Sequence, residues 1–100
     1  MPSPSEKLQE RVRTQKKEPT LYRVILLNDD YTTMEFVMHV LESVFDKSPA
    51  EAYRIMMHVH TNGRGEAGIY PWEVADTKAA SALELARGAG YPLQTVVEEA

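Results

Sequence analysis

The chain has 100 residues, of which 43% are hydrophobic, so one small domain with a single core is expected. It contains no cysteine, which excludes disulfides and thiolate chemistry. No apolar run approaches the roughly 20 residues that a membrane-spanning helix needs, and the polar N-terminus lacks the apolar segment of a secretory signal. These features predict a cytoplasmic protein.

Charge is distributed unevenly along the chain. Residues 1–20 carry five Lys or Arg and three Glu, whereas residues 21–100 carry six basic and twelve acidic residues. An acidic globular part lacks the basic face that phosphate groups require, so nucleic acid is disfavoured and a cationic ligand or partner is favoured. Three prolines and few large aliphatic residues in the first segment predict a mobile N-terminal extension over residues 1–20. Residues 21–100 then form the core domain.

The predicted elements begin with residues 22–27, a short β-branched and aliphatic run that favours a β-strand. An amide and two carboxylates follow, and such side chains favour turns because they hydrogen-bond to nearby backbone. Thr32, followed three residues later by Glu35, is a capping-box pattern that predicts a helix from about residue 33 to residue 46. The carboxylates are therefore expected on a strand-to-helix turn at the surface.

A second helix is predicted to begin at residues 48–51. They provide a capping serine, a proline at the first helical position and a glutamate at the third. The glycine-rich residues 62–65 end this helix because they tolerate left-handed backbone. A short second strand is expected over residues 66–71, where Gly68 either weakens the strand prediction or marks a bulge.

The last predicted helix covers residues 72–89, and small side chains on one side would let it lie close to the sheet. The residues on that side are Ala75, Ala79, Ala82, Leu83 and Ala86. A final strand is expected over residues 93–97. The order βααβαβ predicts an α+β fold, a small sandwich of a three-stranded antiparallel sheet packed on three helices.

The spacing of the carboxylates and histidines along the chain predicts no catalytic site. Asp29 and Asp30 are adjacent, so a catalytic pair would have to act from different directions, and His58 and His60 fall on different faces of a helix. The sequence has no phosphate-binding loop, nucleophile elbow or EF-hand spacing. We therefore predict no enzyme, no cofactor and no metal site.

A binding site for a small cation remains possible on chemical grounds, with the turn at residues 28–30 and His60 around the cation, beside an apolar hollow. His60 follows Met56 by four positions and so lies on the same side of its helix. The alternative for His60 is a helix-terminal cation favoured by the helix dipole. The alternative for Met34 and Met56 is that they only fill the core.

Three motifs carry a resemblance to a known family. They are Asn-Asp-Asp-Tyr-Thr-Thr-Met-Glu-Phe-Val at residues 28–37, Met-Met-His-Val-His at residues 56–60, and Glu-Val-Ala-Asp-Thr-Lys at residues 73–78. In this order and spacing they resemble the ClpS family, bacterial adaptors that deliver N-degron substrates to the ClpAP protease. The likeness covers about residues 20–100.

The resemblance implies a role for individual residues. The α-amino acceptors would be Asn28, Asp29, Asp30 and His60. The wall of the hydrophobic pocket would be Thr32, Met34, Val37, Met56, Val59 and Leu93. The face that docks on the N-domain of the ClpA unfoldase would include Glu73 and Lys78, and residues 1–20 would correspond to the extension that enters the unfoldase.

The function implied by this resemblance is that of a monomeric adaptor for proteins beginning with Phe, Tyr, Trp or Leu, with Met34 rejecting Val and Ile at the pocket mouth. One alternative is a ligand-free interaction module of the same fold, similar to the ribosomal stalk C-terminal domain. Another is an enzyme that uses Asp29, Asp30 and His60. Two residues depart from the family pattern: Thr33 replaces a usual proline and Pro71 a frequent hydroxyl cap, and both are expected outside the pocket.

Overall fold

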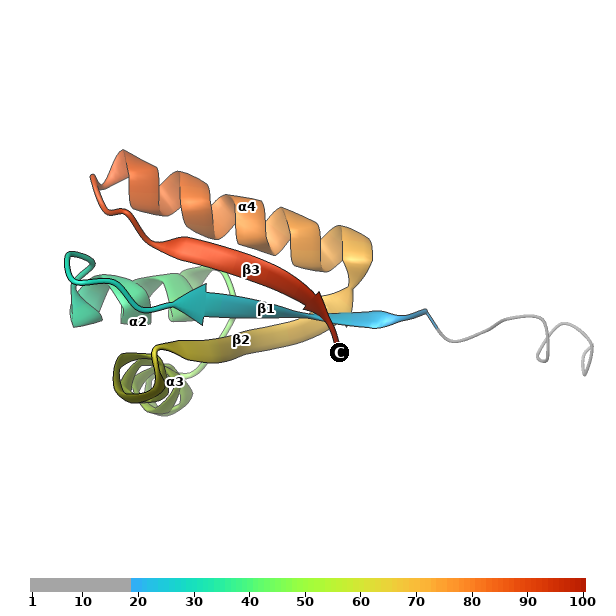
Figure 1. The fold of residues 1–100 in the computed structure, drawn as a ribbon, viewed down its shortest axis with the longest axis horizontal. Coiled ribbons are helices and arrows are strands. Elements are labelled where there is room, and N and C mark those ends of the chain that lie inside the picture. Colours follow the sequence, from blue (N-terminus) through green and yellow to red (C-terminus); the bar gives the residue numbers. More distant parts are fainter. Residues whose placement is uncertain (1–18) are drawn as a thin grey trace, which may run out of the picture.

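The computed structural model describes residues 19–100 (Figure 1). The elements in chain order are β1 (Leu21–Leu27), α2 (Met34–Ser43), α3 (Pro49–Asn62), β2 (Arg64–Pro71), α4 (Trp72–Gly88) and β3 (Gln94–Glu99). The predicted order βααβαβ and the α+β class are confirmed. All but the last two residues of the predicted mobile extension lie outside the described residues, so that prediction is not tested.

The sheet is antiparallel and has the order β2-β1-β3, with the first strand in the centre. The register between β1 and β2 shifts after Val24, which faces Gly68, because Ile25 faces Glu66 and leaves Ala67 as an extra residue. This irregularity is a bulge beside Gly68, which was one of the two interpretations of that glycine. A Cβ there would collide with the ring and hydroxyl of Tyr70, so any other residue requires the Tyr70 side chain to move.

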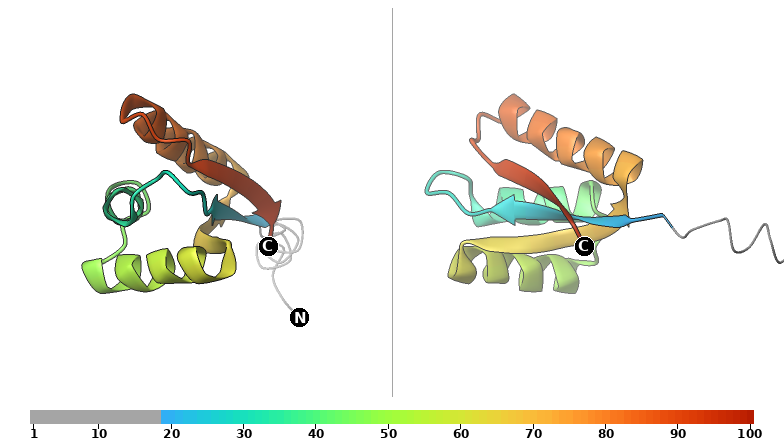
Figure 2. Two further views of the ribbon diagram at one scale, coloured as in Figure 1. Left: turned by 60° about the vertical axis from the view of Figure 1, so that its left-hand side comes forward. Right: turned by 45° about the vertical axis from the view of Figure 1, so that its right-hand side comes forward.

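All three helices lie on one side of the sheet, as the left view of Figure 2 shows. Val24 and Leu26 of β1 face the helices and are fully buried in the core, and Ile25 between them is not part of that core cluster. The expected alanine stripe of α4 is buried too, so the longest helix can lie close to the strands. The buried residues are Ala75, Ala79, Ala82 and Ala86, whereas Leu83, which was expected on the same side, is only partly buried.

The start of α2 differs from the prediction by one residue. Thr33, not Thr32, is the capping residue, because its hydroxyl accepts from the backbone N–H of Phe36 at 3.1 Å. The hydroxyl of Thr32 instead lies in the preceding turn, where it donates to Asp29. The predicted cap of α3 is confirmed, since the Ser48 hydroxyl accepts from the backbone of Glu51.

The end of α2 also comes earlier than predicted, at Ser43. The backbone at Asp46 is left-handed, with φ 54°, which no helix can contain. Lys78 of α4 donates from Nζ to the Val44 carbonyl at 2.6 Å and lies 3.4 Å from an Asp46 carboxylate oxygen. A cation on a neighbouring helix thus satisfies a carbonyl that the ended helix leaves unpaired.

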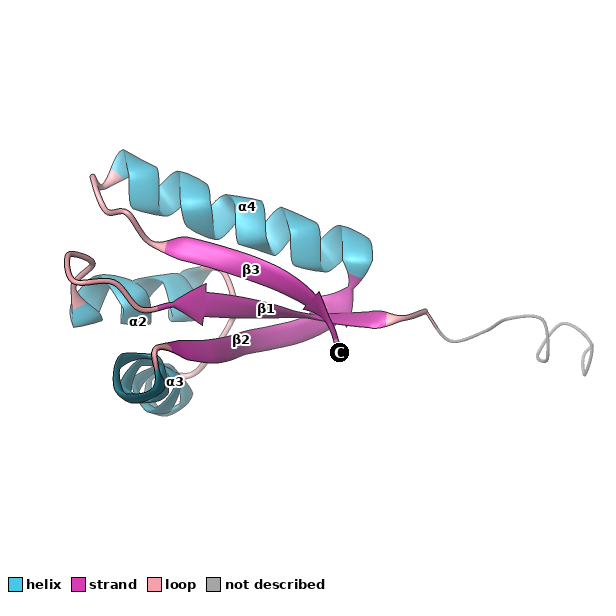
Figure 3. Cartoon of the chain, in the orientation of Figure 1, coloured by secondary structure: helices cyan, strands magenta, loops and turns pink. Residues whose placement is uncertain are grey.

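One end of the sheet gathers three chain segments that are distant in sequence (Figure 3). The turn after β1 lies there, together with the end of α3 and the loop before β3. The backbone N–H of Asn28 donates to the Gly63 carbonyl at 2.9 Å, which joins the turn to the end of α3. Gly63 has φ 86°, and its N–H donates to the Val59 carbonyl and so caps α3. The predicted end of the helix at the glycine is therefore confirmed.

Replacing Gly63 with alanine should lower the free energy of unfolding by about 1 kcal/mol, because an alanine resists left-handed backbone even where there is space for its Cβ. Urea denaturation measures the change. Gly88→Ala is the matched control, since it lies within α4 at ordinary backbone angles and has equal space. Equal stability of both variants would contradict the structural role assigned to Gly63.

Replacing Lys78 with methionine should lower the free energy of unfolding by about 1–3 kcal/mol, because it removes a charged hydrogen bond at a largely buried position. Thermal and urea denaturation measure the loss. The control is Arg54→Met, which removes an exposed cation from α3. A Lys78→Met variant as stable as this control would show that the contact with Val44 contributes little.

Candidate functional site

A hollow of about 380 Å³ opens at the end of the sheet where β1, the start of α2 and the end of α3 meet. Its lining residues are Asn28, Asp29, Asp30, Tyr31, Thr32, Thr33, Met34, Val37, Met56, Val59 and His60. The structure therefore brings together every residue that the sequence assigned to the amine site and to the pocket wall, with one exception. Leu93 is 1% exposed and packs in the core, and it is not among the lining residues.

Three polar side chains on the rim of the hollow are exposed. Asn28 and Asp30 extend the end of β1, and His60 lies in the last turn of α3. Their heteroatoms provide an amide oxygen, a carboxylate and an imidazole nitrogen, which are the acceptors that a small cation with several N–H donors needs. Within residues 19–100, no hydrogen bond or ion pair occupies the side chains of Asp30 and His60.

Asp29 has a different environment from its neighbour. Its Oδ1 accepts from the backbone N–H groups of Tyr31 and Thr32 at 2.8 and 2.7 Å, and its Oδ2 accepts from the Thr32 hydroxyl at 2.7 Å. Partial burial alone would raise the pKa of Asp29, but these hydrogen bonds and the charge of Arg87 together hold that pKa below its usual value. Asp29 is therefore ionised and already hydrogen-bonded within the turn.

The floor of the hollow is apolar and belongs to the core. Val37, Met56 and Val59 are 8%, 4% and 2% exposed, and all three are members of the buried cluster. Met34 is 44% exposed and lies at the edge of the hollow, where α2 begins. Met56 therefore both fills the core and lines the hollow, whereas Met34 is too exposed to be a core residue.

Sequence reasoning missed two lining residues, Tyr31 and Thr33. Tyr31 is 78% exposed, and both lie in the turn between residues already singled out, which is the only signal that could have indicated them. The expectation that Thr33 lies outside the pocket was wrong, because the capping position faces the hollow. Pro71 does lie elsewhere, before α4, and provides no side-chain cap there.

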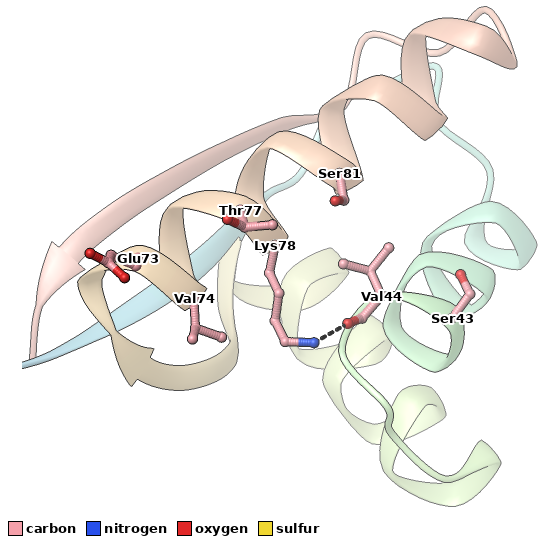
Figure 4. Close-up of a pocket in the computed structure, with 7 residues that line it drawn as sticks. All are labelled: Ser43, Val44, Glu73, Val74, Thr77, Lys78 and Ser81. Atoms are coloured by element: carbon pink, nitrogen blue, oxygen red, sulfur yellow. Dashed lines mark hydrogen bonds between the residues drawn. The ribbon is translucent and has the colours of Figure 1, made fainter.

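The two residues predicted for docking lie on another face. A hollow of about 510 Å³ between α2 and α4 is lined by Ser43, Val44, Glu73, Val74, Thr77, Lys78 and Ser81 (Figure 4). Glu73 is exposed in the first turn of α4, but Lys78 reaches across to α2 and is held by the Val44 carbonyl. The structure thus places both residues on one surface, with only the acidic one fully free to meet a partner.

Residues 19–100 were also compared with the requirements of a metal site and of a membrane-spanning helix. In the described part of the chain, no three His, Asp or Glu side chains cluster closely enough to hold a metal ion. His58 lies outside the hollow and contacts Asn62, whose side-chain nitrogen is 3.1 Å from its Nδ1. No helix among residues 19–100 has the length and apolar character required to cross a membrane.

Comparisons with known proteins identify the family of this chain. Residues 17–96 match the family described as ATP-dependent Clp protease adaptor protein ClpS. The adapter protein ClpS of Maricaulis maris is 55% identical over 89 residues, which cover 89% of this chain and 82% of the relative. ClpS 1 of Agrobacterium fabrum is 53% identical over 89 residues, which cover 89% of this chain and 76% of that protein.

A solved structure is similar as well. The structure of Agrobacterium tumefaciens ClpS2 bound to L-phenylalaninamide has a TM-score of 0.80 and 42% sequence identity, and the match covers 83% of this chain and all of that one. The family consists of protease adaptors, which are not themselves enzymes. The fold, the three motifs and these matches together show that the chain belongs to the ClpS family, the adaptor proteins of the ATP-dependent Clp protease.

Proposed function

We propose that this chain binds the N-terminal residue of proteins that begin with Phe, Tyr, Trp or Leu and delivers them to the ClpA unfoldase of the ClpAP protease. The observation that carries the proposal is the hollow at the end of β1, whose rim is polar and acidic and whose floor is apolar. A cytoplasmic location and a monomeric state, both expected from the sequence and the resemblance, are part of this proposal.

The rim suits a free α-amino group. An α-ammonium has a pKa near 7.7–8.0, so it is mostly charged at neutral pH, and it offers three N–H donors. Asn28, Asp30 and a neutral His60 offer three kinds of acceptor, with Asp29 completing the set of four implied by the resemblance. An acetylated N-terminus has neither the charge nor the three donors, so this rim would distinguish a free N-terminus from a blocked one.

The floor suits a large apolar first side chain. Burial of a Phe or Leu side chain contributes about 1.5–3 kcal/mol, and the hollow of about 380 Å³ is lined there by Val37, Met56 and Val59. Met34 at the edge would contact the part of the ligand nearest its backbone. A β-branched Val or Ile carries its extra substituent at that level, so Met34 would exclude it.

The comparison with a solved relative supports both halves of the site. L-Phenylalaninamide, the molecule bound in the Agrobacterium tumefaciens ClpS2 structure, has a free α-amino group and a Phe side chain. Its amide replaces the next peptide bond of a protein chain. The same chemistry is what the polar rim and apolar floor of this chain would recognise.

Delivery to the unfoldase would use the surface between α2 and α4, through Glu73 and Lys78. This surface and the amine site share no lining residue, so substrate and unfoldase could bind at the same time. Since Lys78 also holds the end of α2, a variant at Lys78 would confuse docking with folding. Glu73→Gln is the cleaner test of docking, because Glu73 is exposed and a Gln preserves its shape.

Of the alternatives, the ligand-free interaction module is disfavoured by the hollow itself, which core side chains do not fill. An enzyme based on Asp29, Asp30 and His60 is disfavoured by family membership and by the turn hydrogen bonds that occupy Asp29.

Peptides that differ only at the first residue test the proposal. We expect tight binding by fluorescence anisotropy for a peptide with a free N-terminal Phe, and binding at least tenfold weaker for its acetylated form and for the Val peptide, a difference of about 1.4 kcal/mol or more. Equal or absent binding of all three peptides would refute the proposed ligand and favour the ligand-free module.

Replacing Met34 with alanine should admit Val and Ile, because the shorter side chain leaves space beside the β-carbon of the first residue. The ratio of Phe to Ile affinity, measured by the same anisotropy assay, should fall by about tenfold. Met38→Ala on the same helix is the control, since Met38 packs against the core and does not line the hollow. Continued rejection of Ile by Met34→Ala would place the selective contact at another residue.

A further inference from the structure

We propose that a second subsite lies beside the candidate site and binds an aromatic side chain at the third residue of the substrate. The inference rests on the proposed function and deepens it, because it extends recognition beyond the first residue. The subsite is a hollow of about 640 Å³, which we call the tyrosine hollow. Its lining residues are Tyr31, Arg87, Gly90, Tyr91, Pro92 and Gln94.

The tyrosine hollow adjoins the candidate site at two points. Tyr31, in the turn after β1, lines both hollows. Tyr91 lies in the loop before β3, and its hydroxyl is 3.5 Å from the hydroxyl of Thr33, which lines the candidate site. A ligand that fills the candidate site can therefore extend directly into the tyrosine hollow.

The sheet determines the direction in which a substrate would run. Leu27, at the end of β1, pairs with Arg64 of β2 on one side and with Gln94 of β3 on the other. Asn28 is joined to the end of α3, which carries His60 and leads into β2, so these acceptors would hold the ammonium on the β2 side. Gln94 and the loop before it lie on the β3 side, so a substrate held in this way would cross the end of β1 toward the tyrosine hollow.

The geometry of an extended chain selects the third residue of the substrate. Successive side chains of such a chain point to opposite sides, so residues 1 and 3 face the same surface, about 7 Å apart. With the first side chain in the candidate site, the third side chain faces the tyrosine hollow. The second side chain faces solvent.

The lining of the tyrosine hollow favours an uncharged aromatic side chain. Its two tyrosine rings and its proline ring present apolar faces, and Tyr31 is 78% exposed. The charged lining residue, Arg87, already donates from Nη1 to the carbonyls of Tyr91 and Leu93 at 2.8 and 2.9 Å, and its charge interacts with that of Asp29. We therefore expect stacking on the rings, and not an ion pair with Arg87, to hold the ligand.

One wall of the tyrosine hollow is fixed by the fold. The Tyr91 N–H donates to the Ala86 carbonyl at 2.8 Å, and the Tyr91 ring lies 4.7 Å from the ring of Phe36 on α2. Gly90 has φ 81°, which lets the chain turn back from the end of α4 directly into this wall. A wall held in this way loses little freedom when a ligand stacks on it.

Peptides that carry a single Trp at a chosen position test the subsite. Each peptide begins with a free Phe and has Ser at positions 2 to 4, except where Trp replaces one of them. By fluorescence anisotropy we expect Trp at position 3 to strengthen binding about threefold to tenfold, and Trp at position 2 or 4 to change it less than about twofold. No gain at position 3, or an equal gain at all three positions, would overturn the inference.

A Glu at position 3 tests the ion pair instead. If the Glu peptide binds more tightly than the Trp peptide, the assignment of an aromatic ligand is wrong, and Arg87 is the residue that selects.

Two variants of the full chain test the residue that would stack. Tyr31→Ala should reduce the ratio of affinities between the peptides with Trp and with Ser at position 3 to less than about twofold. This ratio cancels any effect of Tyr31 on the first residue, which is the same in both peptides. Tyr53→Ala is the control, since Tyr53 is an exposed tyrosine of α3 that lines neither hollow. An unchanged ratio in Tyr31→Ala would show that Tyr31 does not form the subsite.

The outcomes separate the inference from the function on which it rests. If the chain binds the peptides with a free Phe but is insensitive to position 3, the subsite is wrong and the proposed function stands. If the chain binds none of these peptides, the proposed function fails and the subsite fails with it.

Discussion

The hydrogen bond from the Asn28 N–H to the Gly63 carbonyl joins the end of β1 to the end of α3, and the candidate site depends on it. The strand supplies the acidic turn, and the helix supplies His60 three residues before its capping glycine. Only a residue that accepts left-handed backbone can end the helix there and begin β2 at once. The antiparallel pairing of Leu27 with Arg64 then fixes both ends side by side.

The hollow shares its floor with the core, which couples recognition to stability. Met56 and Val59 contact the buried cluster on one side and line the hollow on the other, so their positions are determined by packing throughout the domain. A floor fixed in this way would lose little side-chain entropy on binding the proposed ligand. The exposed residues Met34 and Tyr31 at the edge have more freedom to adapt.

The second surface, between α2 and α4, includes the end of α2, whereas the hollow includes its start. Lys78 joins the two helices there by donating to the Val44 carbonyl just after α2, and its ammonium also lies 5.3 Å from the centre of the Tyr70 ring. Burial and the neighbouring Asp46 carboxylate raise the pKa of Tyr70, so its hydroxyl stays neutral beside that charged pair. The proposed adaptor function requires two binding faces that do not overlap, and the two hollows share no lining residue.

Local sequence signals determined most of the fold, because they act over a few residues. The Ser48 cap, the Gly63 termination, the bulge at Gly68 and the alanine stripe of α4 all follow from short-range backbone and packing rules. The start of α2 does not follow from such rules, because Thr32 and Thr33 are equally good capping residues. In the folded chain Thr33 caps the helix, and the Thr32 hydroxyl donates to Asp29 within the turn.

The residues of the site were named from motifs, but their arrangement was decided by tertiary structure. Spacing cannot show that His60 and Asn28 lie at one rim, that Leu93 is buried away from the hollow, or that Lys78 is held by α2. Those contacts join segments far apart in the chain, and they exist only once the sheet pairs and the helices pack on it. For the same reason two adjacent aspartates, alike in sequence, differ in the folded chain: one faces its own turn and the other faces solvent at the hollow.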